Sequence, residues 1–138
     1  MRILCLDVGD KNIGIALSDP TMSIAQAFKL HKRNSIKKDM AELKQIVEDN
    51  NVKEIVIGLP KDLNGGIGKR AQGVLDLADE IKNHIDVPVV MWDERFSSNE
   101  AHRIFEMAQI NHRKRKPFID MMASQIILQG YLDAQKTR

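Results

Sequence analysis

The sequence predicts an α/β fold with a mixed five-stranded sheet, in which three antiparallel strands and two parallel strands are flanked by helices. Three short apolar segments open the chain with only turns between them, which is typical of antiparallel strands. Two apolar strand segments then alternate with amphipathic helical segments, which is the pattern of parallel crossovers. The chain has 138 residues, the size of one ordinary domain, so we expect residues 1–138 to form a single domain.

The first three predicted strands cover residues 2–8, 12–18 and 23–30. The first of them (RILCLDV) is an apolar run of strand length. Asp19 and Pro20 form a turn signal that separates the second strand from the third. Because the connections are short, these strands are expected to pair as antiparallel neighbours.

Helices and strands alternate in the middle of the chain. Residues 36–49 and residues 69–84 place apolar side chains at helical spacing. Between them, residues 53–59 (KEIVIGL) have the composition of a buried strand, and residues 87–92 (VPVVMW) form the last strand. Helical crossovers would make both strands parallel to the first.

Two more helices are predicted in the last third of the chain. Ser97 and Glu100 form a capping box, which opens a helix. Pro117 suits the first turn of the final helix, because the N–H that proline lacks has no helical partner there. One side of this final helix is expected to face the core, and it carries Met122, Ala123, Ile126, Ile127, Gly130 and Tyr131.

Composition excludes several classes of protein. Lys and Arg number 21 against 19 for Asp and Glu, a net charge of +2 that does not by itself indicate a nucleic-acid-binding protein. The single cysteine, Cys5, excludes an internal disulfide and a cysteine-rich zinc site. The apolar run at the N-terminus stops at Asp7, which is too short for a signal peptide or a membrane span. We therefore expect a cytoplasmic protein that has no membrane partner.

Asp7 is the first residue that could carry chemistry. Strand alternation places it on the same face as Ile3 and Cys5, at the end of a core strand. A carboxylate there is costly unless a metal ion or a basic side chain compensates its charge. A buried salt bridge or a turn-forming role is the alternative. Gly9 and Gly14 favour a functional role, because glycine lets a group such as a phosphate approach the backbone closely.

Further carboxylates follow the last strand and open the final helix. Asp93 and Glu94 point to opposite faces, so only one of them can share a face with Asp7, and alternation does not decide which. Asp120 is favoured in a first helical turn by the helix dipole alone, but it lies three residues before Ala123, toward the buried side. Three carboxylates at one sheet edge would suit Mg²⁺ or Mn²⁺, which can clamp the oxygens of a phosphodiester.

Basic residues cluster in three places. The segment 112–116 (HRKRK) could be a solvated surface or a track along a phosphate backbone, and its position beside Asp120 favours the track. Residues 29–38 contain five Lys or Arg and no acid, and Lys69 and Arg70 follow a glycine-rich turn. Few aromatic residues interleave with these cations, which argues against stacking on single strands.

Four sequence blocks occur in a fixed order: RILCLDVGDKNIGIALSDP, IVIGLPKDLNGGIGKRA, PVVMWDERFSSNEA and KRKPFIDMMASQIILQGYLD. Together they resemble the YqgF family, also called RuvX, of bacterial Holliday junction resolvases and pre-16S rRNA nucleases. The resemblance covers nearly the whole chain. It implies an RNase H-like fold and a metal-dependent endonuclease.

The resemblance also assigns roles to residues. The family's three acids fall on Asp7, Glu94 and Asp120, which selects Glu94 over Asp93 and implies Mg²⁺ or Mn²⁺ as the cofactor. One departure is Asp10, which stands where a hydroxyl residue is frequent and adds negative charge near the site. From the resemblance and the basic clusters together, the candidate nucleic-acid-binding residues are Arg70, Arg95, Arg113, Lys114, Arg115 and Lys116.

The expected function is therefore hydrolysis of phosphodiester bonds in precursor ribosomal RNA or branched DNA, by a monomer or a homodimer. A dimer would suit a two-fold symmetric junction. One alternative is a nucleic-acid-binding protein without catalysis, which would bind equally well in EDTA. Another is a nucleotide-binding module of the actin-like ATPase type, which needs a second lobe that this chain has no room for.

Overall fold

The computed structural model describes residues 1–60, 66–93 and 117–136, with side chains from residue 121 onward in the last segment. Its sheet has the strand order β3-β2-β1-β4-β5. The strands are β1 (Arg2–Val8), β2 (Asn12–Ser18), β3 (Ala25–Lys32), β4 (Val52–Leu59) and β5 (Val89–Asp93). The helices among the described residues are α1 (Ile36–Asp49), α2 (Lys69–His84) and α4 (Pro117–Lys136).

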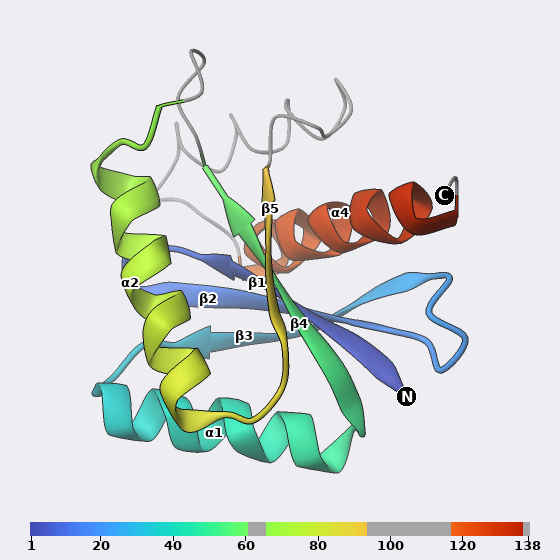
Figure 1. The fold of residues 1–138 in the computed structure, drawn as a ribbon, viewed down its shortest axis with the longest axis horizontal. Coiled ribbons are helices and arrows are strands. Elements are labelled where there is room, and N and C mark those ends of the chain that lie inside the picture. Colours follow the sequence, from blue (N-terminus) through green and yellow to red (C-terminus); the bar gives the residue numbers. More distant parts are fainter. Residues whose placement is uncertain (61–65, 94–116, 137–138) are drawn as a thin grey trace.

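The predicted mixed sheet is confirmed. β2 pairs antiparallel with both β1 and β3, whereas β4 pairs parallel with β1 and with β5. In Figure 1, α1 and α2 cover one face of this sheet and α4 covers the other. The helix predicted after Ser97 lies outside the described residues.

The third strand begins at Ala25, two residues later than predicted, because Asp19 organises the turn before it. The Asp19 carboxylate accepts hydrogen bonds from the backbone N–H groups of Ser23 (2.8 Å) and Ile24 (2.9 Å), so these residues belong to the turn. The hydrogen bonds from Ile24 and from the Thr21 hydroxyl hold the pKa of Asp19 well below its ordinary value. The turn is thus fixed by an ionised carboxylate.

Alternation along the central strands separates two cores. In β1, Leu4 and Leu6 face the α1 and α2 side, whereas Ile3 and Cys5 face α4. All four are buried, as expected for a strand in the middle of a sheet that is covered on both faces. Asp7 continues the alternation onto the α4 face.

The buried side of α4 is rotated from the predicted one. Ala123, Ile127 and Tyr131 are buried as expected, but Met122 is 36% exposed. Ile126 and Gly130 are only partly buried. The buried side continues instead through Ser124, Leu128 and Leu132. The physical reason is Ser124: its hydroxyl donates to the Met121 carbonyl (2.7 Å), so this small polar residue can face the sheet.

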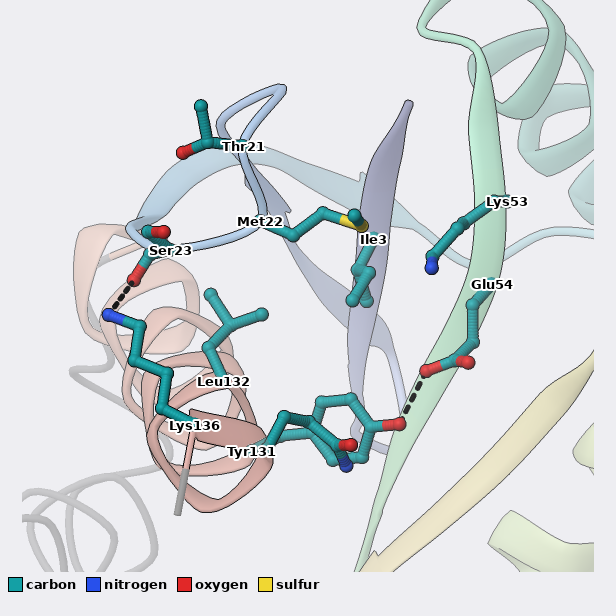
Figure 2. Close-up of a pocket in the computed structure, with 10 residues that line it drawn as sticks. Ile3, Thr21, Met22, Ser23, Lys53, Glu54, Tyr131, Leu132 and Lys136 are labelled. Carbon is teal, nitrogen blue, oxygen red and sulfur yellow. Dashed lines mark hydrogen bonds between the residues drawn. The ribbon is translucent and has the colours of Figure 1, made fainter. Parts of the chain in front are cut away.

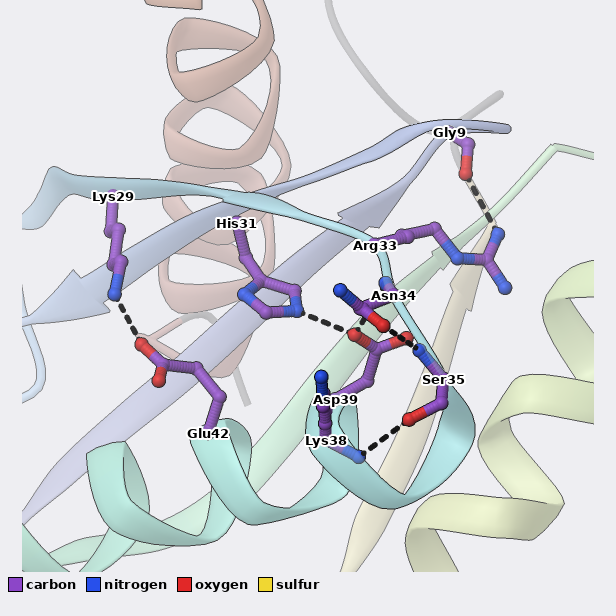
Figure 3. Close-up of polar contacts among 9 residues, drawn as sticks. All are labelled: Gly9, Lys29, His31, Arg33, Asn34, Ser35, Lys38, Asp39 and Glu42. Carbon is purple, nitrogen blue, oxygen red and sulfur yellow. Dashed lines mark hydrogen bonds and ion pairs between the residues drawn. The ribbon is translucent and has the colours of Figure 1, made fainter.

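A polar contact between the partly buried His31 and the buried Asp39 joins the end of β3 to the start of α1 (Figure 3). Asp39 is 1% exposed, and its Oδ1 lies 2.8 Å from His31 Nε2 and accepts a hydrogen bond of 2.8 Å from the backbone N–H of Asn34. Ser35 caps the helix by accepting from the Lys38 N–H at 3.2 Å. Asp39, itself buried, is therefore the acceptor of two partly buried hydrogen bonds.

Asp39→Ala is expected to lower the free energy of unfolding by about 3 kcal/mol, because it leaves His31 and the Asn34 N–H without their acceptor. The matched control is Glu42→Ala, which removes an acid from the same helix. Glu42 pairs with Lys29 at the surface, so its loss should cost less than about 1 kcal/mol. Urea unfolding followed by circular dichroism measures both. Equal midpoints for the two variants would contradict the structural role given to Asp39.

Candidate active site

The carboxyl ends of the parallel strands β1, β4 and β5 meet at one edge of the sheet. Asp7 lies at this edge, one residue before the end of β1, and is only 7% exposed. It faces the side of the sheet that α4 covers, as alternation predicted. A carboxylate with so little contact with solvent interacts strongly with any cation that reaches it.

Two glycines flank Asp7 within the sheet. Gly14 of β2 is its direct partner on one side. On the other side, the pairing of Leu6 with Ile57 brings Gly58 of β4 next to Asp7. Both glycines are on the α4 face, because Ala16 and Val56, two residues away along each strand, pack in the α4-side core. Neither neighbouring strand therefore places a side chain beside the carboxylate on this face.

Of these glycines, sequence analysis identified only Gly14. Gly58 lies inside a segment predicted as a buried strand, where glycine is unfavourable unless another group approaches closely. That positional signal could have identified it.

The direction of α4 brings its first turn toward the same edge. Tyr131 and Leu132, near the C-terminal end of the helix, line a pocket with Ile3 at the start of β1. Figure 2 shows the Tyr131 hydroxyl donating to Glu54 Oε1, at 2.5 Å, in this pocket. The helix has 20 residues and is about 30 Å long. Its first turn, which contains Asp120, therefore lies toward the carboxyl end of β1 (Figure 1).

Asp93 lies on the opposite face from Asp7. Val90 and Trp92 pack against the α4-side core, whereas Met91 packs against the core under α1 and α2. Asp93 lies two residues after Met91 and so is on the same face. It is paired with Leu59, which belongs to the core under α1 and α2, and it is 8% exposed. Of the two acids that alternation had left open, Asp93 therefore lies on the face away from Asp7.

Most of the other predicted site residues lie outside the described part of the chain. This holds for Glu94, Arg95 and the basic residues Arg113, Lys114, Arg115 and Lys116. Arg70 is described, and it is exposed in the first turn of α2. Among the described residues, no group of three or more His, Cys, Asp or Glu is placed to hold a metal ion.

No helix within the described ranges is long and apolar enough to cross a membrane.

Comparison with known families and sequences gives consistent matches. Residues 1–134 match the model of the family described as "RuvX: Holliday junction resolvase". A protein from Desulforamulus reducens is 46% identical over 134 residues, which is 97% of this chain and 98% of that protein. A protein from Thermoanaerobacter pseudethanolicus is 45% identical over 139 residues, which covers all of both chains. Both relatives are named "Putative pre-16S rRNA nuclease".

Solved structures share the fold. The structure titled "T. thermophilus RuvC in complex with Holliday junction substrate" matches with a TM-score of 0.63 at 12% identity, covering 99% of this chain and 96% of that one. The fowlpox virus Holliday junction resolvase matches with a TM-score of 0.55 at 16% identity, covering 97% and 99%. At these identities the likeness concerns the fold alone, and it confirms the expected RNase H-like architecture.

Proposed function

The chain belongs to the RuvX family of Holliday junction resolvases, and from this premise we propose that it is a metal-dependent endonuclease with its active centre at the carboxyl edge of the sheet. The family is one of nucleases, which are hydrolases acting on phosphodiester bonds. The observation that carries the proposal is Asp7, a buried carboxylate at the end of a central strand, flanked by Gly14 and Gly58 on the α4 face. We treat residues 1–138 as a single nuclease domain.

Asp7, Glu94 and Asp120 are the residues that would hold Mg²⁺ or Mn²⁺. Of these three side chains the structure describes that of Asp7, and carboxylate oxygens are the ligands that these cations prefer. The two neighbouring strands put no Cβ beside Asp7 on this face, because both flanking residues are glycine. When bound, the ion would lower the pKa of a bound water and balance negative charge on the phosphate.

The chain itself contributes position and charge. β1 is hydrogen-bonded to a strand on each side, so Asp7 is held on a rigid element, as a precise site requires. Water attacks phosphorus while the bond to the leaving oxygen breaks. The attacking water loses a proton as its bond to phosphorus forms, and the leaving oxygen keeps the electron pair of the broken bond and takes up a proton. Because the nucleophile is water and not a side chain, no covalent enzyme intermediate forms. Arg70, Arg95 and the segment Arg113–Lys116 would bind neighbouring phosphates and hold the nucleic acid in place.

The proposed substrate is structured nucleic acid that the protein meets in the cytoplasm. The names of the relatives support precursor 16S rRNA, and the family description supports four-way DNA junctions. Incubation of the purified chain and Mg²⁺ with each labelled substrate separately tests the choice. Sedimentation with and without substrate distinguishes a monomer from a homodimer. Cleavage of neither substrate would contradict the proposal.

Binding is expected to depend strongly on salt, because the basic segment before α4 would contact phosphates. Changing Lys114, Arg115 and Lys116 together to Gln should lower the slope of log K against log salt by up to about three units. Binding is measured by fluorescence anisotropy over a KCl series, in an Asp7→Asn background that does not cut. The control is Lys37, Lys38 and Lys44 changed to Gln, the same charge change on exposed positions of α1. An unchanged slope in the first triple variant would show that the segment is merely a solvated surface.

A further inference from the structure

A second feature lies at the carboxyl edge, on the face opposite to Asp7. A cleft of about 530 Å³ opens between the turn after β1 and the first two turns of α2. Its apolar floor includes Val8 and Val74, both of which belong to the core under α1 and α2. Its polar lining comes from three separate segments: Gly9 and Asp10, then Arg33, then Lys69, Arg70 and Gly73.

Arg33 is held in place at the rim of this cleft. Its Nη1 donates to the Gly9 carbonyl at 2.9 Å, and its backbone N–H donates to the Lys11 carbonyl at 2.8 Å. Figure 3 shows the second terminal nitrogen of the guanidinium projecting away from Gly9. A guanidinium has five N–H donors in a fixed plane. The bond to Gly9 therefore orients the group and leaves donors for a ligand.

The charges around the cleft favour an anion. Arg33, Lys69 and Arg70 contribute three positive charges, against one negative charge from Asp10. Lys69 and Arg70 are exposed in the first turn of α2, which contains no acidic residue and whose cap, Gly68, makes no side-chain hydrogen bond. The partial positive charge of the helix start adds to that of the side chains.

Gly73 borders open space in the cleft. It lies in the second turn of α2, where glycine lowers helix stability by roughly 1 kcal/mol relative to alanine. A Cβ at this position would meet nothing within 4 Å. Packing therefore does not require glycine here, and the space in front of it is available to a ligand.

We infer that this cleft is a second phosphate-binding subsite, which holds a backbone phosphate of the nucleic acid other than the one that is cut. The inference rests on the proposed function, because that function supplies the nucleic acid. Asp7 and the cleft residue Val8 are adjacent in β1 and face opposite sides of the sheet. The backbone would thus pass over the end of β1, from the cleft on the α2 side to the active centre on the α4 side.

Paired variants test the subsite in the non-cutting Asp7→Asn background. Lys69→Gln combined with Arg70→Gln should weaken binding of a four-way junction about tenfold and reduce the salt slope by about one unit for the single phosphate. The control is Lys37→Gln combined with Lys38→Gln, which removes the same charge from α1. Gly73→Glu should weaken binding as well, whereas Gly73→Ala should not, and Asp10→Asn should strengthen it. Cleft variants that bind like the control pair would overturn the inference.

The source of the phosphate is tested with two further probes. Inorganic phosphate added to the ¹⁵N-labelled protein should shift the amide signals of Gly9, Asp10 and Gly73, and a spectrum without shifts at these residues would overturn the inference. An oligonucleotide should lose the same affinity on Lys69→Gln and Arg70→Gln whether or not it carries a 5′-phosphate. An effect confined to the 5′-phosphorylated form would overturn the assignment to an internal backbone phosphate.

Failure of the subsite and failure of the proposed function give different results. If the wild type cuts the junction but the cleft variants bind normally, only the subsite is wrong. If binding depends on the cleft but the wild type cuts nothing with Mg²⁺, the subsite stands and the endonuclease proposal is wrong.

Discussion

Asp7→Asn is expected to reduce the rate of cleavage by on the order of a thousandfold or more, while the metal-free protein stays folded and is at least as stable as the wild type. Asparagine has nearly the shape of aspartate, so packing at the end of β1 should survive. In the metal-free wild type, Asp7, Glu94 and Asp120 would repel one another at close range. Removing one charge relieves that repulsion.

With Mg²⁺ the order of stability should reverse, because the wild type gains binding free energy that the variant lacks. The measurement is a pair of thermal melts for each protein, in EDTA and in millimolar Mg²⁺, beside the cleavage assay. If Asp7 is instead the partner of a buried basic side chain, its replacement should cost about 3–5 kcal/mol even in EDTA. Such a loss, or full activity in the variant, would contradict the metal site.

Glu94→Gln is expected to abolish cleavage, and Asp93→Asn is expected to retain it. The two variants are neighbours and remove the same charge, so each is a control for the other. Asp93 belongs to the face opposite to Asp7, where it is paired with Leu59, so we expect that it does not share a metal ion with Asp7. Asp93 is buried, so its replacement can lower stability. Each cleavage rate is therefore divided by the fraction of folded protein, which circular dichroism measures. If Asp93→Asn were inactive and Glu94→Gln were active, the result would contradict an active site on the α4 face of the sheet.

The sequence predicted most of the fold because its signals are local. Short turns between the first strands and helical spacing between the later ones were enough to give the mixed sheet. The errors came from polar residues with specific partners. Asp19 delays the third strand by bonding to Ser23 and Ile24. Ser124 can face the sheet because its hydroxyl donates to the Met121 carbonyl. The buried side of α4 therefore includes Ser124 and leaves Met122 exposed.

The candidate site was predictable only in part. Alternation along β1 places Asp7 on the correct face without any tertiary information. The choice between Asp93 and Glu94 needed the family resemblance, and the packing of Met91 then removed Asp93 from the α4 face. The cleft around Arg33 and Lys69 could not be predicted, because its cations come from segments that only the folded chain brings together.

Metal dependence of cleavage tests the central claim most directly. The purified wild-type chain is incubated with labelled precursor 16S rRNA and with a four-way junction, in EDTA and across a Mg²⁺ and Mn²⁺ series, with Asp7→Asn run in parallel. The expected result is cleavage of at least one substrate only with the wild type and a divalent ion. Cleavage that persists in EDTA, or binding without cleavage at any metal concentration, would contradict a metal-dependent endonuclease centred on Asp7.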